Sequence, residues 1–105
     1  MASSAGYLQF ILERLDGLEG IASRKMMGEY LLYFQGKVFG GIYDDRFLVK
    51  VTQAGHALMP SCPQELPYAG AKLMFLIQEL DDRAFLKRLV VETCRELPAP
   101  KPKKK

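Results

Sequence analysis

Apolar side chains recur at two different spacings along the chain, and the change of spacing divides it into elements. Near the start they lie three or four residues apart, the period of an amphipathic helix, and Ser3 and Ser4 precede them as residues that can cap free N–H groups. The apolar positions are Leu8, Ile11, Leu12 and Leu15. This pattern predicts a helix over residues 4–16 that Gly17 and Gly20 bring to an end.

Between residues 21 and 51 the apolar period falls to two, which is typical of strands that turn one face toward a core. The strands expected there are Ala22–Met27, Glu29–Gln35, Val38–Tyr43 and Phe47–Val51. Short turn-forming sequences such as Gln35-Gly36-Lys37 and Asp44-Asp45 separate them. Neighbouring strands are therefore expected to pair antiparallel, as hairpins.

The alternation gives this predicted sheet two unequal faces. The first is apolar throughout and is expected to pack against helices; its members are Tyr30, Leu32, Phe34, Val38, Ile42, Phe47, Val49 and Val51. The second mixes charged residues with the apolar Leu31, Tyr33, Phe39 and Leu48. A face with this much apolar area is not expected to be simply solvated, so we expect another part of the chain or a partner to cover some of it.

The second half of the chain predicts fewer elements. Prolines and glycines interrupt residues 52–70, which leaves room for a short helix at Ala54–Met59. A strongly apolar strand at Lys72–Gln78 is expected to pair inside the sheet, and a last helix, capped by Asp81 or Asp82, ends before Pro98. The fold class that follows is α+β, with a largely antiparallel sheet of about five strands and a helix at each end of the chain.

Composition and charge indicate one domain followed by a tail. Residues 1–97 contain enough apolar positions for a single core, whereas residues 98–105 hold only alanine, proline and lysine and are expected to stay extended and mobile. Four of the fifteen basic residues lie in this tail, so residues 1–100 carry 11 basic against 12 acidic side chains and are nearly neutral. The basic tail residues are Lys101, Lys103, Lys104 and Lys105.

Candidate chemistry is sparse. Cys62 and Cys94 form no CxxC pair and His56 is the only histidine, so we expect free thiols, no metal and no cofactor. No leader sequence or membrane-spanning run is visible, which favours a cytoplasmic protein without a membrane partner. Gly40 and Gly41, inside a predicted strand, match no phosphate-binding motif and indicate a bulge or a close backbone approach. The methionines, Met26 and Met27 among them, are expected in the core, with an adaptable interface as the alternative.

Three segments carry a resemblance to a known family. They are Arg24-Lys25-Met26-Met27-Gly28-Glu29-Tyr30-Leu31-Leu32-Tyr33, Gly36-Lys37-Val38-Phe39 and Asp44-Asp45-Arg46-Phe47-Leu48-Val49-Lys50. Their order and spacing resemble the N-terminal domain of the TfoX/Sxy family, as does Pro67-Tyr68-Ala69-Gly70-Ala71-Lys72 before the last strand and helix. The resemblance implies an α+β domain and a place among regulators of bacterial natural competence, which act as transcriptional co-activators. Longer members carry a second, helical domain, so this chain is expected to be a stand-alone form.

The polar residues of the shared segments have two interpretations. They are Arg24, Lys25, Glu29, Asp44, Asp45, Arg46, Lys50 and Lys72. Turn chemistry and exposed ion pairs explain them structurally, each pair contributing at most about 1 kcal/mol. Alternatively, together with Leu31, Tyr33, Phe39 and Leu48 they form a surface that binds a partner.

Three functional hypotheses follow. In the first, the chain is a non-enzymatic regulatory domain whose second sheet face binds another protein or a second copy of the chain. In the second, the tail lysines bind nucleic acid weakly through phosphate contacts, helped by Arg24, Lys25 and Lys37. In the third, the chain is an enzyme that uses His56 or Cys62, which lie six positions apart and could act as a pair.

Overall fold

The structure is a computed structural model that describes residues 4–97, so the predicted tail and its lysines lie outside the described residues. Three helices and six strands make up this part of the chain. In chain order they are α1 (Ala5–Arg14), β1 (Ile21–Met26), β2 (Glu29–Phe34), β3 (Lys37–Tyr43), β4 (Arg46–Lys50), α2 (Gln53–Leu58), β5 (Gln64–Glu65), β6 (Met74–Leu76) and α3 (Arg83–Glu96). The predicted α+β class is confirmed.

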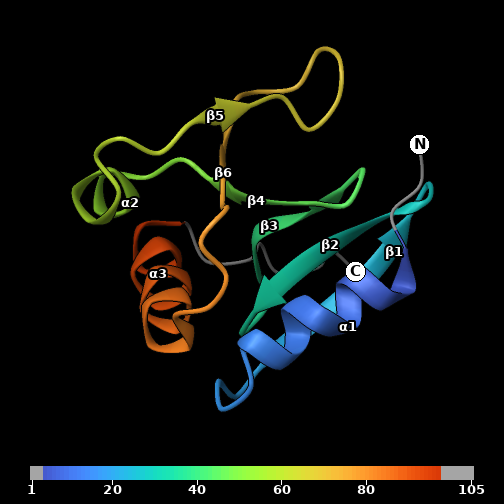
Figure 1. Ribbon diagram of the computed structural model, residues 1–105, viewed down its shortest axis with the longest axis horizontal. Helices are drawn as coiled ribbons and strands as arrows, with labels where there is room; N and C mark the ends of the chain where they lie inside the picture. The colour runs from blue at the N-terminus through green and yellow to red at the C-terminus, as the bar shows by residue number, and fades with distance from the viewer. Residues whose placement is uncertain (1–3, 98–105) are drawn as a thin grey trace, which may run out of the picture.

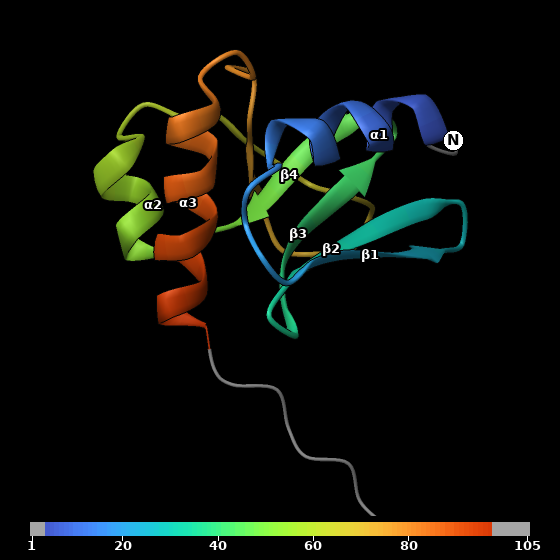
Figure 2. The ribbon, with the colours of Figure 1, turned by 90° about the horizontal axis from the view of Figure 1, so that it is seen from below.

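The strands form one antiparallel sheet in the order β1-β2-β3-β4-β6-β5. Helices α1 and α3 lie on the same face of it, and α2 lies beside α3 (Figures 1 and 2). The predicted apolar strand in the second half pairs between β4 and β5, as expected, but it is only three residues long. The two-residue strand β5 was not predicted, because two residues cannot show a period.

Three tight turns set the register of the first four strands. Met27–Gly28, Gln35–Gly36 and Asp44–Asp45 each have two successive residues with φ between 52° and 85°. Two central residues with positive φ define the type I′ turn, whose twist matches that of the flanking strands. The pairs Met26↔Glu29 and Tyr43↔Arg46 therefore close their hairpins without slippage.

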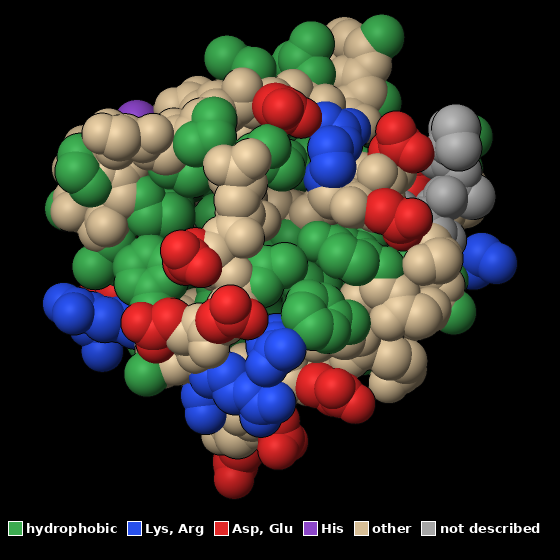
Figure 3. Space-filling model, viewed as in Figure 1, with side chains coloured by type: hydrophobic (Ala, Val, Ile, Leu, Met, Phe, Trp, Pro, Cys, Tyr) green, Lys and Arg blue, Asp and Glu red, His purple; other side chains and the backbone are tan. Residues whose placement is uncertain are grey.

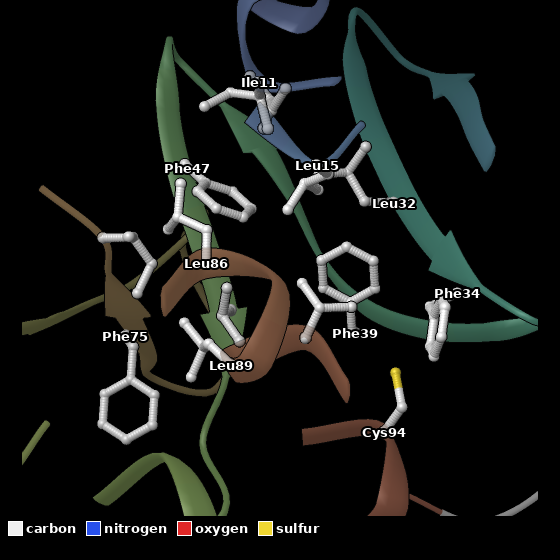
Figure 4. Packing of buried hydrophobic residues seen from close by; sticks show 14 of the residues in the cluster. Ile11, Leu15, Leu32, Phe34, Phe39, Phe47, Phe75, Leu86, Leu89 and Cys94 are labelled. Carbon is white, nitrogen blue, oxygen red and sulfur yellow. The ribbon is translucent and has the colours of Figure 1, made fainter. Parts of the chain in front are cut away.

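The core lies between the sheet and the two long helices. Figure 4 shows Ile11 of α1, Leu15 just after it, and Leu86 and Leu89 of α3 pointing at the aromatic rings of the sheet. The sheet contributes Leu32, Phe34, Phe39, Ile42, Phe47, Val49 and Phe75, and Ile77 follows directly after β6. This arrangement confirms that the predicted apolar face is sealed by the first and last helices.

A bulge in β3 changes which of its residues enter the core. Tyr33 pairs with Val38 while Leu32 pairs with Gly40, so Phe39 is the extra residue between these pairs. Phe39 is completely buried in the core and Val38 stands opposite Tyr33 on the other face. The predicted faces of these two residues were therefore wrong, because strict alternation does not hold through a bulge.

The glycines next to the bulge let β3 approach its neighbours closely. A Cβ atom on Gly40 would lie 2.2 Å from the Leu48 carbonyl oxygen, and one on Gly41 would lie 2.5 Å from the Tyr30 carbonyl oxygen. The predicted roles of the pair, a bulge and a close backbone approach, are confirmed.

The helix ends are fixed by side-chain caps. Ser4 Oγ accepts a hydrogen bond from Tyr7 N at 3.1 Å, and Asp82 Oδ1 accepts one from Phe85 N at 3.0 Å. Of the two predicted caps for α3, Asp82 is thus the one used. Glu96, at the end of α3, accepts hydrogen bonds from Gln53 N and Ala54 N, so its carboxylate satisfies the first free N–H groups of α2.

Replacing Thr93 with valine should raise the free energy of unfolding by about 1 kcal/mol, because its fully buried hydroxyl has no hydrogen-bond partner among the described residues. Thr52→Val is the matched control, since Thr52 Oγ1 caps α2 by accepting a hydrogen bond from Gly55 N at 3.0 Å. It should lower stability by about 1 kcal/mol. Urea unfolding of both variants checks the opposite signs, and equal losses would contradict the first assignment.

Candidate partner-binding surface

Arg46 fixes the loop that covers part of the second sheet face. Its Nη1 donates to Glu65 Oε1 at 2.7 Å and to the Leu66 carbonyl at 3.2 Å, and its Nη2 donates to the Pro67 carbonyl at 3.4 Å. Nε donates to the Tyr43 carbonyl at 3.1 Å. One planar guanidinium thus ties β4 to the start of residues 66–73, named here the 66–73 loop. The prediction that something covers this face is confirmed, and the cover is the chain itself.

The 66–73 loop brings Tyr68 onto Tyr43. Pro67 is buried, and the two tyrosine rings lie 6.0 Å apart and tilted by 53°. Burial, and after it the neighbouring Tyr68 and Glu29, raise the pKa of Tyr43, so its hydroxyl keeps its proton and can donate a hydrogen bond. This edge of the surface therefore presents two aromatic rings with hydroxyl tips.

A hollow of about 700 Å³ opens beside these rings. We name it the Met–Tyr hollow; it is lined by Met26, Met27, Glu29, Tyr30, Leu31, Tyr43 and Tyr68. Figure 1 shows that the β1–β2 turn, the β3–β4 turn and the 66–73 loop all lie at this end of the molecule. The lining is mostly apolar with a few polar groups, which is the usual make-up of a binding site.

The two methionines of the hollow are exposed, contrary to the expectation that they lie in the core. Met27 is 96% exposed and Met26 45% exposed. Met27 also has a φ of 52° at the first position of its turn, where Asn or Asp is preferred and an ordinary side chain costs about 1–2 kcal/mol. Neither folding nor packing accounts for an apolar side chain here. The signal in the sequence was the Met-Gly pair at a hairpin turn.

The structure divides the residues predicted for the surface. Leu31 and Tyr33 are half-buried on the second face, whereas Phe39 and Leu48 have no exposed area. The prediction that those two contribute to a surface was therefore wrong: the bulge directs Phe39 into the core, and Leu48 is enclosed on the face that the 66–73 loop covers. Tyr68 belongs to the surface and was not predicted.

Four of the eight polar residues of the shared segments, Glu29, Asp44, Asp45 and Arg46, take part in hydrogen bonds that fix turns or the 66–73 loop. Glu29 Oε1 accepts a hydrogen bond from Asp44 N at 3.1 Å, and Asp45 Oδ1 accepts one from Ser4 N at 2.9 Å. These bonds fix the β3–β4 turn and attach it to the start of α1. The remaining predicted side chains are exposed; they are Arg24, Lys25, Lys50 and Lys72.

The predicted nucleic-acid surface is not continuous in the described residues. Lys37 Nζ donates to the Cys94 carbonyl at 2.9 Å. Its positive charge there interacts favourably with the negative, C-terminal end of the α3 dipole. Arg24 and Lys25 are neighbours in a strand and so project from opposite faces of the sheet. On the face seen in Figure 3, Lys and Arg side chains are interspersed with Asp and Glu. The hypothesis thus rests on the tail lysines, which lie outside the described part.

His56 and Cys62 each contact other residues, and no hydrogen bond joins the two within residues 4–97. The His56 ring packs edge-on against Phe75, with the ring centroids 5.1 Å apart. The Cys62 thiol donates to the carbonyls of Pro63 and Leu76 at 3.4 and 3.3 Å, and burial raises its pKa, which disfavours the reactive thiolate. Cys62 and Cys94 are both free thiols, as predicted.

Within residues 4–97 no group of three or more His, Cys, Asp or Glu side chains could hold a metal ion. None of the helices in this range is long and apolar enough to cross a membrane.

Replacing Arg46 with lysine should loosen the 66–73 loop, because an ammonium group cannot hold the side chain and three carbonyls that the guanidinium contacts. We expect amide hydrogen exchange in the loop to accelerate at least about tenfold and stability to fall by about 1–2 kcal/mol. Arg95→Lys is the control, since within residues 4–97 Arg95 pairs only with Glu92, at 3.3 Å on the surface. Unchanged exchange in the loop would show that Arg46 does not fix it.

Fold and surface together define a small α+β domain with helices on one sheet face and an open, partly apolar surface at one end. Comparison with known proteins gives the family: residues 13–95 match the TfoX N-terminal domain, and the chain belongs to this family. It is 34% identical over 105 residues to an uncharacterized 12.7 kDa protein in the trpE 5' region of Spirochaeta aurantia, covering 99% of this chain and 91% of that protein. No solved structure matches the chain.

Proposed function

We propose that this chain is a non-enzymatic regulatory domain that binds another protein through the Met–Tyr hollow. The observation that carries the proposal is Met27, an almost fully exposed apolar side chain held in a left-handed turn at the rim of an apolar hollow. Residues kept in an unfavourable conformation, without a packing reason, are found preferentially at functional sites. Methionine also suits a binding surface because its flexible, polarisable side chain adapts to a partner.

The arrangement around Met27 supports binding rather than catalysis. Tyr68 is 63% exposed and lines the same hollow as the two methionines, so aromatic and flexible apolar side chains border one space. Aromatic residues and methionine are enriched in the centres of protein interfaces. No nucleophile with a partnered base lines the hollow.

Affinity capture from native cell extract tests this function. The unmodified chain should retain a specific protein that Met27→Glu loses, because a carboxylate introduced at the rim would have to be desolvated on binding. Val51→Glu is the matched control: Val51 is also an exposed apolar residue, 38% exposed, but it lies beyond the far end of β4 and should leave capture unchanged. Circular dichroism confirms that both variants fold. Capture that is indifferent to Met27→Glu would refute the assignment of the surface.

A further inference from the structure

Within residues 4–97, no strand pairs with the outer edge of β1. β1 is the outermost strand of the sheet and pairs only with β2, through six consecutive registered pairs from Ile21↔Phe34 to Met26↔Glu29. Because antiparallel pairing uses the N–H and C=O groups of alternate residues, the other residues of β1 direct theirs away from β2. Five of its six residues are exposed. A regular, uncovered edge of this kind is a template for another strand.

The middle of this edge is basic. Arg24 and Lys25 are adjacent, so one charge projects from each face of the sheet. Neither makes an ion pair or a side-chain hydrogen bond among residues 4–97, in contrast to Arg46 and Lys37. Charged edge residues discourage indiscriminate pairing, and pairing with a second copy would bring like charges together. The same charges would favour a strand that carries carboxylates.

The apolar end of the edge leads into the Met–Tyr hollow. Met26 lies on the same face of the sheet as Arg24, and its side chain lines the hollow. In an added strand, the residue opposite Met26 would stand about 5 Å from it, within reach of the hollow for a large side chain. β1 thus presents main-chain groups that are not paired with β2 along its outer edge. Two cations lie in its middle and an apolar cavity at its end.

We infer that β1 accepts an extended acidic segment of a partner protein as an additional strand of the sheet. Adjacent carboxylates meet Arg24 and Lys25, and a large apolar side chain enters the hollow next to Met26 and Met27. Main-chain hydrogen bonds supply affinity in such strand addition, while side-chain pockets and charges supply selectivity. The inference rests on the proposed function and names the chemical class of its partner.

The test uses the full chain, labelled with ¹⁵N, and three synthetic peptides. The first is acetyl-Thr-Phe-Glu-Glu-Val-Thr-amide; the second replaces both glutamates with lysine; the third is the first with alternate amides N-methylated, so that one edge cannot pair. The first should shift the amide resonances of β1, β2 and Met27. The second should bind at least about tenfold more weakly at low salt, because two ion pairs become repulsive. The third should lose binding.

The variant Arg24→Glu/Lys25→Glu should reverse the preference between the first two peptides. Strand addition is overturned if the glutamate peptide does not bind at millimolar concentration, or binds no better than the lysine peptide. It is also overturned if N-methylation makes no difference. In each of these cases, protein capture that depends on Met27 would leave the proposed function standing. If that capture also failed, the proposed function would be refuted together with strand addition. Self-association that perturbs the amide resonances of β1 in the absence of any peptide would assign the edge to a second copy and also overturn the inference.

Discussion

Replacing Gly40 with alanine should lower the free energy of unfolding by about 3 kcal/mol, a large share of the stability of a small domain. The added Cβ would lie 2.2 Å from the Leu48 carbonyl oxygen and 3.0 Å from Val49 Cα. Both contacts are with the β4 backbone, so no side chain can rotate to relieve them. The strands β3 and β4 must separate, which weakens their four registered pairs and the packing of the core residues between them.

Gly6→Ala is the matched control for this substitution. Gly6 lies in α1, is exposed, and has nothing within 4 Å of its added Cβ, so alanine should leave stability unchanged or raise it by up to about 1 kcal/mol. Thermal unfolding followed by circular dichroism compares the two variants, and Gly40→Ala should lower Tm by at least about 10 °C. A loss below about 1 kcal/mol would show that β3 and β4 are not held this closely.

Most of the fold could be predicted because its strands are local in sequence. The hairpin turns need residues with positive φ, and Gly28 and Gly36 supply them without strain. Since each turn joins strands that pair directly, the period of two and the turn positions determine the order β1-β2-β3-β4. The helix caps are local as well, which is why Ser4 and Asp82 are visible in the sequence.

The wrong predictions concern positions whose structure depends on contacts between residues that are distant in sequence. Alternation cannot reveal that one extra residue of β3 is accommodated opposite Leu32 and Tyr33, so the faces of Val38 and Phe39 were exchanged. The role of Arg46 depends on carbonyls about twenty positions further along the chain. A single sequence gives no sign of such an anchor.

The candidate surface was predicted in part for the same reasons. The surplus of apolar residues on the second sheet face was real, and Leu31 does line the hollow. Tyr68 enters it only because Arg46 holds the 66–73 loop over the sheet, and the exposure of Met27 follows from its place in a turn. The sequence therefore indicated the correct face of the sheet. Which residues form the surface on that face depends on how the 66–73 loop and the β1–β2 turn fold.

Phe39→Ala should be at least as damaging as the glycine substitution, with a loss of about 3–5 kcal/mol. The ring is fully buried among residues of β2 and α3, as Figure 4 shows, and its removal would leave a cavity that the surrounding strands cannot fill. Val38→Ala is the decisive comparison, because strict alternation would make Val38 the core residue. It stands on the outer face and is only partly buried, so its truncation should cost about 1 kcal/mol or less.

Urea unfolding of both variants measures the difference, and Phe39→Leu extends the series if Phe39→Ala does not fold. Leucine retains much of the ring's volume, so Phe39→Leu should lose less stability than Phe39→Ala and more than Val38→Ala. We expect the loss of stability to decrease in the order Phe39→Ala, Phe39→Leu, Val38→Ala. This order would show that Phe39, and not Val38, occupies the core. A larger loss at Val38 than at Phe39 would mean that β3 keeps its alternation, returning Phe39 to the outer face and to the partner-binding surface.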